Sequence, residues 1–302
     1  MLDYGEKMAE SPADFEESEF RGPLFNQLLR GNNLLWEPGQ VFEEHIGIDY
    51  AALVKHELFW RYRNGRYREG LSLAGTGLGY IWKKKKKGKV LPPFALNLFI
   101  QAKRSNQKSP VPKKVKDKGL ANPCCFLNID QQQQAALHRL SSALKGKGLV
   151  CYAAPAFLKQ SDLYLHTEKR SIVQNSTFPS AGKLQGHSRW YYDRSGTFGV
   201  ANPQFERVEI DQIGAQIESL VTKNEDINQS FSQNLAFLAE AVNSTTDSPD
   251  EISSRDTWFS HLAQLLTDEA EEVLGDVPVE LRSYLRVQAY CHAYNLEWLS
   301  LQ

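Results

Sequence analysis

The chain has 302 residues, of which 41% are hydrophobic and 24% charged, and its formal net charge at pH 7 is −1. This length accommodates one large domain or two ordinary ones, and an aromatic share of 11% excludes a wholly disordered chain. No run of 18 apolar residues is present, so no membrane span is expected. The first residues lack the basic and then apolar pattern of a secretory signal, so we expect a cytoplasmic protein with no membrane partner.

The charges are segregated along the chain. Residues 55–118 contain 18 basic and 3 acidic side chains, a net charge of +15, whereas residues 205–302 contain 5 basic and 18 acidic side chains, a net charge of −13. Such opposite halves suggest different partners or a contact between the two. We place a boundary near Asn202 and predict a domain at 1–202 and an acidic helical region at 203–302.

The N-terminal part of the chain predicts a helix followed by strands. Apolar residues Phe20, Leu24 and Leu28 recur at the fourfold spacing of a helix, and Gly31 stops the pattern. Pro23 argues against one continuous helix, unless it lies in a first turn. The sequence ALNLFIQAKR further on predicts a compact apolar strand, and the proline- and lysine-rich residues after it predict a loop.

The middle of the chain alternates between strand and helix patterns. Residues 124–130 and 149–157 predict buried strands, which favours an α/β sheet covered by helices. The intervening helix begins with a run of four glutamines to which we assign no role, and a second short helix is expected to be capped by Ser161 or Asp162. The side chains expected to face inward from the first helix are Ala135, Leu137, Leu140 and Leu144.

Beyond residue 170 the pattern changes. Residues 171–203 predict a loop-rich stretch, and the remainder predicts helices at 211–224, 230–242, 257–274 and 279–302. The four cysteines show no CxxC pair and no zinc-finger spacing, so free thiols are expected.

One ordered set of residues carries recognisable chemistry: Glu19 on an early helix, Asp49 at a strand end, and Gln101 with Lys103 on a later strand. Residues two apart on a strand share a face, so Gln101 and Lys103 are expected to point the same way. A divalent metal that activates water for phosphodiester hydrolysis takes oxygen ligands. Gln101 could supply one, and Lys103 could orient the water or stabilise phosphorane charge.

At these residues the sequence resembles the PD-(D/E)xK nuclease superfamily, most closely its Mrr-like restriction endonuclease branch with a Q-x-K variant. The resemblance covers residues 15–110 and implies a restriction-endonuclease-like mixed sheet flanked by helices, here with an α-helical C-terminal region. It implies a Mg²⁺ or Mn²⁺ site with Asp49 and Gln101 as ligands and Lys103 as the catalytic lysine. Glu19 would be the helix carboxylate, with Glu17 as a competitor, and Glu44 a further ligand.

Two features depart from the family pattern. The interval between Asp49 and Gln101 is longer than a minimal core needs, which indicates an insertion. Gln101 also stands where glutamate is usual, and this loss of a negative charge is expected to weaken metal binding.

The basic block predicts contacts with nucleic acid. Clustered positive charge neutralises phosphates, and interleaved tyrosines can stack on unpaired bases. The residues assigned to this interface are Arg61, Arg63, Arg66, Arg68, Lys83, Lys84, Lys85, Lys86, Lys87, Arg104, Lys113 and Lys114.

The resemblance and the charge together predict a Mg²⁺-dependent endonuclease that acts on DNA rather than RNA. By analogy with the family, the protein would be an effector in a bacterial restriction or anti-phage defence system. The helical tail could bind a partner protein such as an ATPase or a sensor, and a homodimer is possible. The alternative is a catalytically weak or inactive nuclease-fold subunit that binds nucleic acid within a larger assembly.

Overall fold

The computed structural model describes residues 9–29, 35–36, 96–121, 123–194, 196–225, 229–245 and 279–301, and every structural statement below concerns these residues. The elements in chain order are β1 (Ala9–Pro12), α1 (Glu17–Leu29), β2 (Leu35–Trp36), β3 (Leu96–Ala102), β4 (Asn106–Ser109), α5 (Lys113–Lys116), β5 (Cys124–Asn128), α6 (Gln131–Ala143), β6 (Gly148–Pro155), α7 (Gln160–Glu168), the 3-10 helix η3 (Val173–Asn175), β7 (Ser176–Thr177), the 3-10 helix η4 (Ala181–Leu184), β8 (Arg189–Tyr192), β9 (Phe198–Asn202), β10 (Glu206–Glu209), α8 (Ile213–Thr222), α9 (Phe231–Thr245), α13 (Val279–Ala293) and β11 (Glu297–Leu301).

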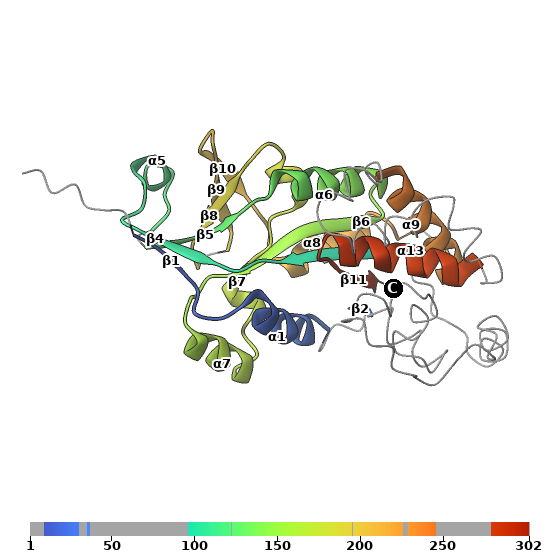
Figure 1. Cartoon of the computed structure of the whole chain (residues 1–302), viewed down its shortest axis with the longest axis horizontal. Helices are drawn as coiled ribbons and strands as arrows, with labels where there is room; N and C mark the ends of the chain where they lie inside the picture. The colour runs from blue at the N-terminus through green and yellow to red at the C-terminus, as the bar shows by residue number, and fades with distance from the viewer. Residues whose placement is uncertain are drawn as a thin grey trace, which may run out of the picture.

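Two sheets form the framework (Figure 1). The central sheet has the strand order β2-β11-β3-β6-β7, in which β3 and β6 are parallel and the other neighbours antiparallel. The second sheet has the order β1-β4-β5-β8-β9-β10 and is antiparallel throughout. Helices flank the central sheet, so the predicted α/β class with mixed sheets is confirmed.

Strand β3 lies in the middle of the central sheet and is buried along its whole length. Leu98 and Ile100 pack with α1, α7 and α8, whereas Phe99 packs on the opposite side with α6, α9 and α13. A strand covered on both faces carries a continuous apolar run. The strand predicted from ALNLFIQAKR is therefore confirmed, and its burial on both faces explains why most of its residues are apolar.

Helix α1 buries the three residues that its fourfold spacing predicts, Phe20, Leu24 and Leu28. Pro23 lies inside this helix without dividing it, so the expectation of a break is wrong. A proline removes its own N–H from the helix ladder, while the buried stripe holds the turns on both sides against the sheet.

Helix α6 is confirmed, but its buried face is shifted from the expected one. Ala135 is exposed, and Gln134 and Ala136 are buried instead, together with Leu137. Gln134 is accommodated because its Nε2 donates to the Ala181 carbonyl at 2.6 Å and its Oε1 accepts from Tyr152 Oη at 2.6 Å. These hydrogen bonds offset the free-energy cost of removing the amide from water.

The N-terminus of α7 is capped from a distant part of the chain. The Asp14 carboxylate accepts a hydrogen bond from the backbone N–H of Gln160, and the residue before the helix, Lys159, makes no side-chain cap. The prediction that Ser161 or Asp162 caps this helix is therefore wrong, because a tertiary contact supplies the acceptor.

The stretch predicted as loop-rich contains the antiparallel pair β8 and β9 of the second sheet. Trp190 of β8 is fully buried, and its ring lies where a Cβ atom at Gly199 of β9 would be. Glycine in the strand admits this close approach, and the packing of one tryptophan over a glycine is not visible as periodicity in the sequence.

The end of the chain differs from the predicted continuous helix. Helix α13 ends at Ala293, Asn295 has the left-handed φ of 53°, and residues Glu297–Leu301 form β11. A left-handed residue ends a helix, and β11 then pairs antiparallel with β3, with Glu297 opposite Ile100.

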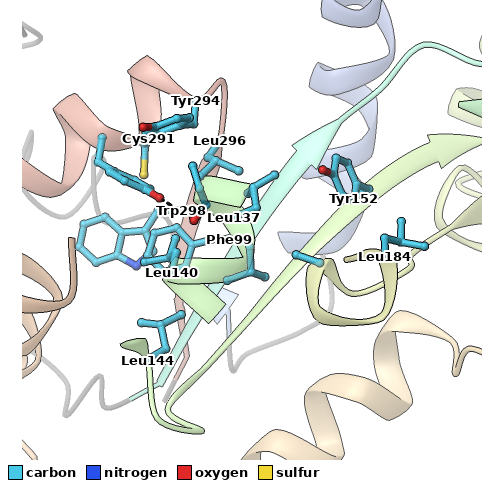
Figure 2. Close-up of a cluster of buried hydrophobic side chains, with 14 of the residues drawn as sticks. Phe99, Leu137, Leu140, Leu144, Tyr152, Leu184, Cys291, Tyr294, Leu296 and Trp298 are labelled. Atoms are coloured by element: carbon cyan, nitrogen blue, oxygen red, sulfur yellow. Dashed lines mark hydrogen bonds between the residues drawn. The ribbon is translucent and has the colours of Figure 1, made fainter. Parts of the chain in front are cut away.

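The helices beyond residue 202 share the core of the central sheet. Leu140 of α6, Leu235 of α9, and Tyr290 of α13 belong to one buried cluster with Phe99 of β3, part of which Figure 2 shows. The division of the chain at residue 202 stays a prediction, and the helix predicted at 257–274 lies outside the described residues.

All four cysteines are buried free thiols, as predicted. Burial raises the pKa of Cys124 to about 11 and that of Cys151 to about 12. Thiols held in this form are poor nucleophiles. No helix in the described part of the chain is long and apolar enough to cross a membrane.

Candidate active site

The Q-x-K residues lie where β3 ends and the chain crosses to the second sheet. The backbone N–H of Lys103 donates to the Ala153 carbonyl of β6 at 2.8 Å, which extends the parallel pairing by one residue. Gln101 and Lys103 both reach hydrogen-bond partners on the side of the sheet that α6 and α13 cover. Their common orientation agrees with the period of two along a strand.

Gln101 is fully buried, and only one end of its amide is satisfied. Its Nε2 donates to the Tyr294 carbonyl at 3.0 Å, whereas its Oε1 has no hydrogen-bond partner among the described residues. An unsatisfied buried polar atom costs about 1–3 kcal/mol. The Oε1 atom is therefore an oxygen to which a cation or a hydrogen-bond donor could bind with a gain in stability.

Within the described ranges, Lys103 donates to an amide oxygen rather than to a carboxylate. Its Nζ donates to Gln133 Oε1 at 2.9 Å, and Gln133 Nε2 in turn donates to the Tyr294 carbonyl at 2.7 Å. Burial lowers the pKa of Lys103, and the nearby carboxylates of Glu17 and Asp130 oppose this effect. The site thus contains a partly desolvated lysine whose charge is supported by two carboxylates.

The two candidate helix carboxylates have different surroundings. Glu17 acts electrostatically on Lys103, and its Oε1 accepts from Asn295 Nδ2 at 2.6 Å. Glu19 accepts from Gln160 Nε2 at 3.0 Å through one oxygen and from the N–H of Glu16 at 2.7 Å through the other, as a residue that caps its own helix. Of the two, Glu17 lies with the Q-x-K residues.

Arg104, predicted to bind nucleic acid, contacts the segment before α1. Its guanidinium donates to the Ala13 carbonyl and lies 3.2 Å from a Glu16 carboxylate oxygen. These contacts tie the end of β3 to the start of α1, which brings Glu17 to the site.

The other predicted interface residues lie elsewhere. Lys113 and Lys114 are exposed on α5, beside the second sheet and far from α1 in Figure 1, and Lys114 Nζ lies 5.2 Å from the centre of the Phe205 ring. The predicted residues outside the described part of the chain are Glu44, Asp49, Arg61, Arg63, Arg66, Arg68, Lys83, Lys84, Lys85, Lys86 and Lys87.

Three residues of the site were missed from the sequence: Gln133, Tyr294 and Asn295. Gln133 belongs to the glutamine run at the start of α6, where nothing local distinguishes it from its neighbours. Tyr294 contributes a backbone carbonyl, which carries no sequence signal. Asn295 carried one weak signal, since asparagine is favoured where a helix ends in the left-handed conformation.

The described residues fit part of an oxygen-liganded metal site. Mg²⁺ and Mn²⁺ prefer oxygen ligands. Gln101 Oε1, which has no hydrogen-bond partner among the described residues, and the Glu17 carboxylate are donors of this kind. No group of three or more His, Cys, Asp or Glu side chains in the described ranges could hold a metal ion. The other predicted ligands Asp49 and Glu44 lie outside those ranges.

Comparison of the chain with protein-family models, curated proteins and solved structures finds no match. The resemblance to the PD-(D/E)xK superfamily thus has no support from relatives. It rests on the motif residues, and the nuclease function rests on their chemistry.

Proposed function

We propose that the protein is a metal-dependent nuclease that hydrolyses phosphodiester bonds in DNA. The observation that carries the proposal is that two functional groups lie at the end of β3: Gln101 Oε1, which is buried without a hydrogen-bond partner among the described residues, and the Lys103 ammonium, which Gln133 holds. Phosphodiester hydrolysis requires an oxygen-liganded metal and a positive charge beside the reacting phosphate. These two side chains supply one requirement each, on the same side of the strand.

Each residue of the site has its own role in the proposed reaction. Gln101 and Glu17, with Asp49 as predicted, would hold Mg²⁺ or Mn²⁺, which when bound would polarise a phosphoryl oxygen and lower the pKa of a bound water. Lys103 would orient the attacking water or stabilise the charge that develops on the phosphorane. Glu19 is a weaker candidate ligand than Glu17, because both of its oxygens accept hydrogen bonds within the fold.

The basic residues are the reason for proposing a nucleic acid as the substrate. Lys113 and Lys114 are exposed on α5, and they belong to the stretch 55–118 with its net charge of +15. Contacts between these lysines and phosphates would hold a polynucleotide across the second sheet without reading its sequence.

A salt titration tests the substrate contact. We expect Lys113→Ala with Lys114→Ala to weaken DNA binding and to reduce the slope of log affinity against log salt by about 2. Lys169→Ala, a matched change of an exposed lysine just after α7, is expected to leave the slope unchanged. Equal slopes for all three proteins would contradict a role for α5.

The wider setting is part of the same proposal. The protein would have the restriction-endonuclease-like fold and act in the cytoplasm as an effector in a bacterial restriction or anti-phage defence system. The acidic region 203–302 would bind a regulating ATPase or sensor protein, and two copies would cut two strands as a homodimer. A net charge of −13 in that region supports a role other than contact with nucleic acid.

Cleavage assays test the proposed activity. We expect purified protein to cut plasmid or linear DNA with Mg²⁺ or Mn²⁺, to be inactive with a chelator, and to lose cleavage in the Asp49→Ala variant. RNA as the only substrate cut would correct the substrate class. Absence of cleavage of any of the three substrates with either metal would contradict the proposal.

A second candidate function is a nuclease-fold subunit that binds nucleic acid without cutting it. Gln101 favours this alternative, because a neutral amide at this position binds a divalent cation more weakly than a carboxylate does. Retained salt-dependent DNA binding without metal binding or cleavage would support it.

A further inference from the structure

The turn between α13 and β11 contacts three side chains of the candidate site. Tyr294 accepts hydrogen bonds from the amides of Gln101 and Gln133 through its carbonyl, and Asn295 donates one to Glu17 through its side chain. The site therefore combines α1, near the start of the sequence, β3 and α6, from its middle, and this turn, near its end.

The helix end explains why the Tyr294 carbonyl can accept two side chains. The N–H of Leu296 donates to the Cys291 carbonyl at 2.7 Å, and that of Asn295 to the His292 carbonyl at 3.3 Å. With Asn295 left-handed at φ 53°, this is the Schellman pattern of a helix C-terminus. Because the pattern uses the carbonyls of Cys291 and His292, it leaves that of Tyr294 to the amides of the site.

Asn295 has a second role besides ending the helix. Glycine is the residue that most easily takes a left-handed φ, and asparagine takes it at a modest cost. The asparagine amide adds the hydrogen bond to Glu17 Oε1 at 2.6 Å, which a glycine could not make. One residue thus sets the backbone of the turn and holds the Glu17 carboxylate, which acts electrostatically on Lys103.

We infer that the Tyr294–Asn295 turn is part of the active site, with Asn295 a positioning residue for Glu17 and Gln133 a positioning residue for Lys103. The inference rests on the proposed nuclease function. Residues that orient a ligand or a charged group typically change activity or metal affinity by about 10- to 100-fold when removed. The C-terminal region would then contribute residues to the active site, in addition to those of α9, α13 and β11 that it contributes to the core.

The first variant isolates the side-chain amide of Asn295. Asn295→Gly keeps a residue that takes the left-handed φ and removes only the donor to Glu17. We expect kcat for Mn²⁺-dependent DNA cleavage to fall about 10- to 100-fold, with KM for DNA nearly unchanged, at temperatures well below the unfolding midpoint. An unchanged kcat, or a loss that disappears wherever the variant is fully folded, would overturn the role of Asn295.

An exchange of the two partners separates positioning from mere structure. In Asn295→Asp, two carboxylates face each other, whereas in Glu17→Gln with Asn295→Asp the hydrogen bond is restored in reverse and the carboxylate has moved to position 295. We expect the double variant to recover the unfolding midpoint lost in Asn295→Asp but not kcat. Recovery of kcat together with the midpoint would show that the contact is only structural and would overturn the inference.

The same assay tests Gln133. Gln133→Met is expected to lower kcat about 10- to 100-fold because Lys103 loses its acceptor, while Gln132→Met, the change of an exposed neighbour on α6, leaves kcat as in the wild type. Equal kcat for both variants would overturn the role of Gln133. Failure of the wild-type protein to cleave is a separate result, which would remove the proposed function and this inference with it.

Discussion

Lys103 and Gln133 are joined by a hydrogen bond of 2.9 Å from the lysine Nζ to the glutamine Oε1. A neutral acceptor holds the ammonium in place without neutralising it. The charge of Lys103 is supported from a greater distance by Glu17 and Asp130, against the burial that lowers its pKa. In the proposed nuclease, the hydrogen bond to Gln133 would hold the ammonium in position for a substrate phosphate.

Gln101→Glu is expected to lower the stability of the metal-free protein and to raise its affinity for Mn²⁺. Without metal, the new carboxylate would be buried against the Tyr294 carbonyl, and the free energy of unfolding should fall by about 1–3 kcal/mol. With Mn²⁺, affinity should rise about tenfold because a charged ligand replaces a neutral one. Calorimetric titration checks the affinity, with Gln185→Glu as an exposed control of equal charge. Unchanged affinity would count against Gln101 as a ligand.

Asp14→Ala is expected to destabilise the protein by about 1 kcal/mol, because Asp14 caps α7 through the N–H of Gln160. Ser161→Ala, at a position where the sequence alone predicts the cap, should change stability by less than about 0.5 kcal/mol. Urea unfolding measures both. The reverse order of effects would place the cap at Ser161.

Gly199→Ala is expected to cost about 1–3 kcal/mol or more, because the Trp190 ring occupies the place of the added methyl group. The matched change Gly214→Ala on α8 meets no atom within 4 Å and should be neutral or stabilise the helix by up to about 1 kcal/mol. Thermal unfolding distinguishes the two variants. A loss in Gly214→Ala equal to that in Gly199→Ala would contradict the packing described for Trp190.

The buried thiol of Cys151 is expected to make stability fall at alkaline pH. Burial raises its pKa from the ordinary 9.0 to about 12, so above pH 9 the unfolded chain loses this proton while the folded protein keeps it. The stability that the neutral thiol contributes is therefore complete below pH 9 and is lost as the pH rises toward 12. Unfolding free energies from pH 8 to 11 should fall less steeply for Cys151→Ala than for the wild type. Equal slopes would contradict the shift.

Local patterns predicted the elements whose burial follows a simple period. The stripe of Phe20, Leu24 and Leu28 identified α1, and the apolar run of β3 identified a strand, which the structure covers on both faces. The strand pair β8 and β9 escaped prediction because Trp190 packs over Gly199, a contact between strands rather than a repeat within one. Strand β11 escaped because it starts four residues after α13 ends, and the helical pattern seemed to continue.

The candidate site was predictable only where its residues are neighbours in sequence. Gln101 and Lys103 share a strand, so their common orientation follows from the period of two. The partner of Lys103 is 30 positions away, and Glu17 and Asn295 are 278 positions apart. Pairings over such distances depend on how α1, α6 and α13 pack around the sheet, which no local pattern contains.

The most direct test of the account is the rate at which supercoiled plasmid is nicked with Mn²⁺ by the wild type, Lys103→Met and the matched surface variant Lys169→Met. We expect Lys103→Met to lose activity about 100-fold or more, because it removes the positive charge that, in the proposed function, stabilises the reacting phosphate. Lys169→Met should cut at the wild-type rate. A Lys103→Met variant that nicks plasmid as fast as the wild type would contradict the central claim that the Q-x-K strand carries the chemistry.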